Sequence, residues 1–142
     1  MYVFGGYDGT FRNDLHTFNF VTNTWYPVNY QGFSPPNLFK SSAVTSNDFL
    51  YIFGGSNGSY SINDIYAFCY STERWSQIKA KASPIPHPRD SNIMVAHQNS
   101  LFIFGGIINA TSNDFLEFRL NDSKWIKLNI KSMEPKPRHG HS

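Results

Sequence analysis

The chain has 142 residues, a formal net charge of +2 at pH 7 and 40% hydrophobic residues, enough apolar material for a core. Its basic side chains are too scattered for the dense stripe that nucleic acid requires, so we expect no nucleic-acid partner. The single cysteine, Cys69, excludes an internal disulfide framework and favours a cytoplasmic location. No apolar run approaches the roughly 18 residues that span a bilayer. We therefore expect no membrane partner, and we expect no signal peptide because the first repeat, YVFGG, begins at residue 2.

The expected elements are short strands, since no stretch shows a sustained helical period of 3.6 residues. An aromatic run, YVFGG, begins at residue 2 and is followed by a loop, the strand NDLHTFNF, the turn VTNT and the strand WYPV. The same order recurs after KSSAVTS and after SNIMVAH, which read as innermost strands. A Pro-rich link, SPIPHPR at 83–89, separates the second series from the third.

Three kinds of landmark repeat with a spacing of about fifty residues, which identifies an internal repeat. We expect an all-β fold of one domain, 1–142, with repeat units at approximately 1–36, 37–87 and 88–136, and with 137–142 starting the next unit. The landmarks are Gly5-Gly6, Gly54-Gly55 and Gly105-Gly106, then Asn13-Asp14, Asn63-Asp64 and Asn113-Asp114, then Trp25, Trp75 and Trp125.

Each landmark has a physical reason. A glycine doublet at a strand end permits positive φ and close backbone approach. The Asn and Asp side chains are expected to bond their own backbone and order the loop exit. The tryptophan provides a large apolar surface to lay against a neighbouring sheet. Runs such as YIF and AFCY are apolar throughout, which predicts sheets covered on both faces, as when sheets stack radially about an axis.

These motifs together resemble the kelch repeat: the Gly-Gly doublet after an aromatic strand, the Asn-Asp start of the next strand, and the Trp of TNTW, TERW and DSKW. PRHGHS at 137–142 is similar to the signature that precedes an innermost strand in that family. The resemblance implies a kelch-type β-propeller segment of about three four-stranded blades. Two blades are complete, the first lacks its inner strand, and the ring is incomplete. The signature is weaker in PRDSNIM, and Leu38 stands where an arginine is expected.

The remaining blades would come from a longer chain or, as the less favoured alternative, from a second copy. A longer chain is favoured because HGHS is too short to supply a partner's inner strand.

The resemblance also implies a binding face, made by the loops after each doublet and by the links into each innermost strand. Exposed aromatic side chains beside Arg and Asn are the mixture found at protein-recognition hot spots. An alternative for Arg89 and Arg138, left open by the sequence, is that they brace neighbouring loops by bonding carbonyls. The expected face comprises Tyr7, Asp8, Phe11, Arg12, Phe33, Lys40, Ser56, Asn57, Ser59, Tyr60, Arg89, Ile107, Ile108, Asn109, Arg138 and His139.

Catalytic chemistry is the weaker interpretation. Asp14, Asp64 and Asp114 recur once per unit, which marks them as architectural, and the other carboxylates are scattered. His139 and His141 lie within the family signature and have no Cys or carboxylate cluster near them, so we expect no metal and no cofactor. The expected function is a protein-interaction module, scaffold or adaptor, with another protein as its partner. Resemblance suggests ubiquitin-ligase substrate adaptors or regulators of small GTPases and the cytoskeleton. The alternative is a kelch-fold enzyme, an oxidase or sugar epimerase.

Overall fold

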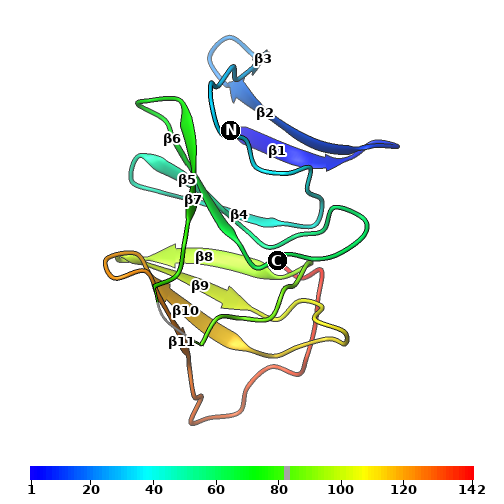
Figure 1. The fold of residues 1–142 in the computed structure, drawn as a ribbon, viewed down its shortest axis with the longest axis vertical. Coiled ribbons are helices and arrows are strands. Elements are labelled where there is room, and N and C mark those ends of the chain that lie inside the picture. The colour runs from blue at the N-terminus through cyan, green and yellow to red at the C-terminus, as the bar shows by residue number, and fades with distance from the viewer. Residues whose placement is uncertain (82–83) are drawn as a thin grey trace.

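The computed structural model describes residues 1–81 and 84–142, so Ser83, the first residue of the expected link, lies outside them. The described residues form eleven β-strands in three antiparallel sheets and no helix (Figure 1). The predicted all-β class is confirmed. Among these residues there is accordingly no helix that could cross a membrane.

The first sheet has three strands, each paired with the next along the chain. A bulge between Phe4 and Gly6 interrupts the pairing of its first two strands, where the glycine doublet takes positive φ. The strands are β1 (Tyr2–Tyr7), β2 (Phe11–Asn19) and β3 (Thr24–Pro27).

The second and third sheets have four strands each and the same up-and-down order. The second contains β4 (Ser42–Ser46), β5 (Phe49–Phe53), β6 (Ile65–Cys69) and β7 (Arg74–Ile78). The third contains β8 (Ile93–His97), β9 (Ser100–Phe104), β10 (Phe115–Arg119) and β11 (Lys124–Lys127). The proposed limits of the repeat units remain a prediction.

The three sheets share one register at their last hairpin. In each sheet the tryptophan of the last strand stands opposite a phenylalanine of the strand before it, with ring centroids 4.9 to 5.2 Å apart. The turns of these hairpins also share a residue with positive φ, at Asn23, Glu73 and Ser123. The opposed pairs are Phe18 and Trp25, Phe68 and Trp75, and Phe118 and Trp125.

The second sheet is buried on both faces. Side chains alternate along a strand, so neighbours in β5 point to opposite sides. Leu50 and Ile52 join the apolar cluster shared with the first sheet, whereas Tyr51 and Phe53 join the cluster shared with the third. The apolar run of β5 is unbroken because both faces of its sheet are covered, as the sequence predicted.

The first and third sheets are each covered on one face within the described chain. In β9, Leu101 and Ile103 are buried against the second sheet, while Phe102 and Phe104 point the other way and are half-buried. Trp25 of the first sheet is 47% exposed, because the tryptophans face the preceding sheet in the chain and none of the described sheets precedes the first.

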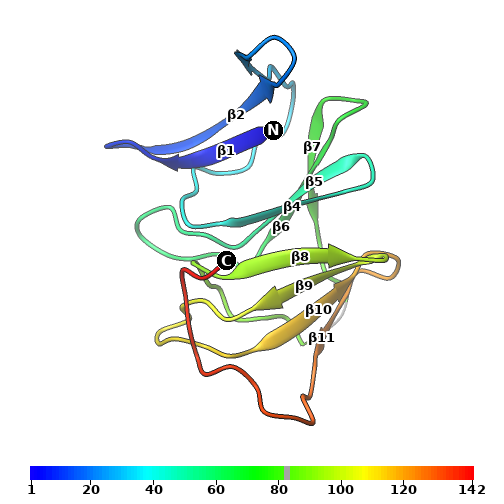
Figure 2. The same ribbon diagram turned by 180° about the vertical axis from the view of Figure 1, so that it is seen from behind.

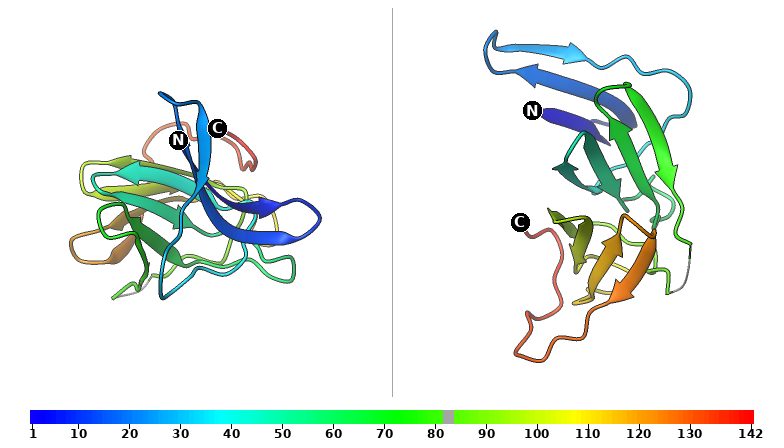
Figure 3. Two further views of the ribbon diagram at one scale, coloured as in Figure 1. Left: turned by 90° about the horizontal axis from the view of Figure 1, so that it is seen from above. Right: turned by 90° about the vertical axis from the view of Figure 1, so that its left-hand side faces the viewer.

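The sheets stand side by side in an arc, with β4 packed against β8 (Figure 2). Both chain ends lie on the side of the arc where β4 and β8 lie (Figure 3). The described residues leave the arc open, as the predicted incomplete ring requires.

The Asn side chains of the Asn-Asp pairs correct one expectation. The amide of Asn63 donates to the carbonyl of Pro86 at 2.8 Å, and that of Asn13 donates to the carbonyl of Pro35 at 3.0 Å. Pro35 and Pro86 are buried residues of the links, where a carbonyl needs a donor. The two amides thus tie the links to the sheets instead of bonding their own backbone.

Candidate functional site

The backbone brings each link beside the loop that follows a glycine doublet. The second glycine of every doublet donates its N–H to a link carbonyl, at 2.8 to 3.0 Å. The next link residue then bridges to the following sheet: Phe39 exchanges two hydrogen bonds with Ser56, and Asp90 exchanges two with Ile107. Loops and links are therefore gathered at one end of the sheets. The glycine contacts are Gly6 to Leu38, Gly55 to Arg89 and Gly106 to Arg138.

An aromatic patch lies where the first loop meets the first link. We define it as Tyr7, Phe11, Phe39 and Lys40. The ring centroids of Tyr7 and Phe11 are 5.0 Å apart, and those of Phe11 and Phe39 are 5.2 Å apart. The ammonium of Lys40 lies 4.9 Å from the centre of the Phe39 ring. Tyr7 is 61% exposed, so the patch presents an aromatic surface to solvent beside a cation.

Phe39 was not predicted as a site residue. Its signal is positional, because it occupies the link position that Asp90 and His139 hold in the later units. Its ring becomes part of a surface only through contact with a loop about thirty residues earlier in the chain.

The patch reaches the second loop through Phe11. A Cβ on Gly58 would overlap the Cζ atom of Phe11, so the ring packs directly on that glycine. Asn57 organises this loop by accepting hydrogen bonds from the N–H groups of Ser59 and Tyr60. Ser56 accepts from the N–H of Gly58. Tyr60, at 64% exposure, is the side chain that this loop offers to a partner.

The charges of the first loop are paired. The guanidinium of Arg12 donates to both carboxylate oxygens of Asp8, the shortest contact being 2.8 Å between Nη2 and Oδ2. This hydrogen bond, with further ones from Thr10, lowers the pKa of Asp8 to about 2. Both side chains are exposed, and the two-pronged contact fixes how the two charges face each other at the surface.

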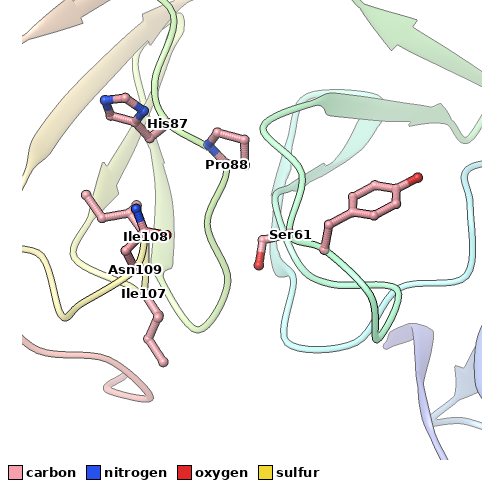
Figure 4. Close-up of a pocket in the computed structure, with 7 residues that line it drawn as sticks. Ser61, His87, Pro88, Ile107, Ile108 and Asn109 are labelled. Atoms are coloured by element: carbon pink, nitrogen blue, oxygen red, sulfur yellow. The ribbon is translucent and has the colours of Figure 1, made fainter.

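A hollow of about 510 Å³ lies between the second loop, the second link and the third loop. Ser61 stands across it from Ile107, Ile108 and Asn109 (Figure 4). Apolar and polar side chains line it together, and this mixture is typical of a recognition pocket. Ser61 lies in the second predicted loop and His87 and Pro88 lie in the predicted link 83–89, but none of the three was assigned to the face. The lining residues are Tyr60, Ser61, His87, Pro88, Ile107, Ile108 and Asn109.

The remaining predicted residues lie outside both the aromatic patch and the hollow. His139 and Arg138 are exposed on the last link. Phe33 stacks on Tyr66 of β6, with centroids 5.9 Å apart, and so belongs to neither the patch nor the hollow. Arg89 is 1% exposed, which corrects its placement on the surface.

Arg89 instead braces the second sheet against the third, the alternative that the sequence left open. Its Nη1 donates to the carbonyl of Gly105 at 3.1 Å, and its Nη2 donates to the carboxylate of Asp114 at 3.0 Å. Lys127 donates to the other oxygen of that carboxylate at 2.7 Å. Burial alone would raise the pKa of Asp114, but the hydrogen bonds from Lys127 and Arg89 outweigh it, and the pKa is lowered.

The lowered pKa of Asp114 predicts an acid-sensitive contact. A depressed folded-state pKa stabilises the fold above the unfolded value, near 3.8, and this contribution is lost as the pH falls through the folded value. Asp114→Asn should therefore be less stable than the natural chain at pH 7, with the difference shrinking below pH 3.8. Urea unfolding across this range measures it. Asp14→Asn, at the equivalent but 55% exposed carboxylate, is the control. An equal pH dependence in the Asp114→Asn variant and the natural chain would contradict the assignment.

Comparison with known proteins agrees with these features. The family model "KLHDC2/KLHL20/DRC7 Kelch-repeats domain" matches residues 1–142. Leucine-zipper-like transcriptional regulator 1 homolog of Drosophila melanogaster is 31% identical over 88% of this chain and 14% of its own length. Rab9 effector protein with kelch motifs of Bos taurus is 38% identical over 75% of this chain and 30% of its own. N-(sulfonatooxy)prop-2-enimidothioate sulfolyase of Thlaspi arvense is 29% identical over 90% of this chain and 40% of its own length.

The chain thus spans less than half the length of each of these relatives. The family model covers all of it, and the doublets, Asn-Asp pairs and tryptophans occupy equivalent places in successive antiparallel sheets. The chain belongs to the kelch-repeat family.

Proposed function

We propose that this chain is a protein-interaction module that binds another protein through its loop face. The loop face is defined as the aromatic patch, the adjoining Asp8–Arg12 pair and the hollow. The observation that carries the proposal is that the patch and the hollow are continuous. Phe11 of the patch packs on Gly58 of the second loop, and that second loop also presents Tyr60 at the edge of the hollow. Exposed Tyr side chains on loops held by backbone hydrogen bonds lose little conformational entropy on binding.

The kind of partner is a narrower proposal. The relative from Bos taurus is named as a Rab9 effector, which supports a small-GTPase partner for the loop face. The paired Asp8 and Arg12 would then set the orientation of that partner, since exposed charges act mainly on specificity and association rate. An adaptor that presents substrates for ubiquitin transfer is the other role within the same class.

Replacing Tyr7, Arg12 and Tyr60 together with alanine should weaken partner binding by about tenfold or more, because aromatic and Arg side chains dominate interface energies. The measurement is capture of proteins from a lysate of the source cells by the immobilised chain, with GTP-loaded Rab9 as a defined probe. A protein bound equally by the triple variant does not use this face.

The matched control replaces Phe20 and Val21, which are 68% and 92% exposed at the opposite end of β2. This variant removes comparable apolar surface and should keep full binding. Capture lost in both variants would indicate nonspecific adhesion and would contradict the proposal.

The second candidate is an enzyme, favoured by the similarity to the Thlaspi arvense sulfolyase. The hollow of about 510 Å³ has room for a small substrate. In an enzyme the hollow would bind a small substrate, whereas in an interaction module it would bind part of a partner protein. Loss of protein capture on substitution of the patch alone, with the hollow intact, supports the interaction module.

A further inference from the structure

A second hollow, of about 320 Å³, lies between the first and second sheets, at the end of the sheets away from the loop face. Tyr2 begins β1, and the glycine doublet lies toward the opposite end of that strand. The first sheet lines this hollow with Tyr2, Thr17 and Tyr26. The turn between β6 and β7 adds Tyr70 and Glu73. We call this site the tyrosine hollow.

Tyr2 and Tyr26 stand on either side of Thr17 in one cross-strand row. Thr17 pairs with Tyr2 of β1 and with Tyr26 of β3. Paired residues point to the same face of a sheet, here the face toward the second sheet, because Phe4, two residues after Tyr2, packs on Trp75. Neighbouring strands lie about 4.8 Å apart, so β1 and β3 are about 9.6 Å apart. A cation held midway between the two rings would lie within the distance of about 6 Å at which a ring face attracts it.

The second sheet supplies further rings and a negative charge. The ring of Tyr70 stacks on that of Tyr2, with centroids 4.8 Å apart, and Phe68 lies beside them at the hollow. Among the described residues that line the tyrosine hollow, Glu73 is the one carboxylate and none is basic. Glu73 also has no cationic side chain within 4.0 Å in the described part of the chain. The charge of the site therefore favours a positive ligand.

The tyrosine hollow is not a general property of the repeat. At the equivalent place between the second and third sheets, three of its residues are replaced by side chains with neither a ring nor a charge. The counterpart of Tyr2 there, Tyr51, is 6% exposed, whereas Tyr2 is 38% exposed. Packing of one sheet on the next thus does not require these tyrosines. The replacements are Ser76 for Tyr26, Leu120 for Tyr70 and Ser123 for Glu73.

We propose that the tyrosine hollow binds the trimethylated side chain of a lysine on a partner protein. Several aromatic rings beside one carboxylate suit a quaternary ammonium group, which has no N–H to donate and is attracted by ring faces. The hydroxyl of Tyr70 is buried and has no hydrogen-bond partner in the described chain, so its oxygen is free to accept weak C–H···O contacts from the polarised methyl groups. An unmodified lysine is more strongly hydrated and loses more on entering the site.

The exposed parts of the two walls favour lysine over a free ion as the source of this group. Tyr2 is 38% exposed and Tyr26 is 46% exposed. The four-carbon stem of a lysine covers apolar ring surface that a free quaternary ammonium ion leaves in water. Because the tyrosine hollow and the loop face lie at opposite ends of the sheets, this proposal stands or fails independently of the proposed function of the loop face.

The test compares two peptides that differ only in charge, by isothermal titration calorimetry with the full-length protein. One peptide carries trimethyl-lysine, and the other carries its neutral isostere, with a tert-butyl group in place of the trimethylammonium. We expect the trimethyl-lysine peptide to bind about tenfold or more tightly than the isostere, because attraction to ring faces and to Glu73 requires the charge. Equal affinity for the two peptides, or no binding of the trimethyl-lysine peptide, would overturn the proposal.

Substitutions then locate the bound peptide. Tyr26→Leu should weaken binding of the trimethyl-lysine peptide by about tenfold, and Glu73→Gln by about threefold. Phe33→Leu is the matched control and should keep the natural affinity, since Phe33 is 45% exposed but lies on the first link. Unchanged affinity in Tyr26→Leu, with the peptide still bound, contradicts the site. Choline bound as tightly as the peptide contradicts lysine as the source.

Discussion

Replacing Arg89 with alanine is expected to lower the free energy of unfolding by about 3 to 5 kcal/mol. The guanidinium is buried between the second and third sheets, where it satisfies the carbonyl of Gly105 and one oxygen of Asp114. Alanine leaves both acceptors without that donor and leaves a cavity where the largest fully buried side chain stood. Lys127 still binds Asp114, but it is largely exposed and does not reach the buried carbonyl.

The measurement is urea unfolding at pH 7, followed by tryptophan fluorescence. Arg119→Ala is the matched control, because Arg119 also contacts a carboxylate, that of Glu117 at 3.2 Å, but is 53% exposed. Exposed pairs contribute about 1 kcal/mol or less, so this variant should unfold close to the natural chain. If the two variants lose equal stability, Arg89 does not hold the sheets together.

Arg89 also shows where sequence-based prediction ends. The sequences around it, HPRD, and around Arg138, KPRH, are nearly alike, and both residues were assigned to the surface or to a brace on the same grounds. One is buried and the other exposed, because a sheet lies against the first within the described chain. That difference is set by contacts between residues about twenty-five apart, which a local pattern does not contain.

The architecture was predictable because its determinants are local and repeated. Trp75 and Trp125 lie fifty residues apart and stand in the same register opposite a phenylalanine, so each repeat carries its own strand order. The apolar run around Phe53 correctly predicted a sheet covered on both sides.

The candidate site was less predictable, because its parts come from different repeats. Tyr7 and Tyr60 could be placed on loops from their position after the doublets. Phe39 and His87 could not, since their surroundings depend on how the links pass beside those loops. The binding role of these residues remains a prediction.

Replacing Gly54 with alanine is expected to lower the free energy of unfolding by about 3 kcal/mol, from backbone strain together with steric overlap. Gly54 has φ +65°, and a Cβ there would lie 2.5 Å from the carbonyl oxygen of Arg89. That oxygen cannot retreat freely, because it accepts the N–H of Gly55 at 2.9 Å. Gly140→Ala separates the two causes: Gly140 has φ +61° but open space around its Cβ position, so this variant should lose only about 1 kcal/mol. Thermal unfolding of both variants measures the difference. Equal losses would mean that the doublet is kept for its backbone conformation alone, and not for the close approach that brings each link beside its loop.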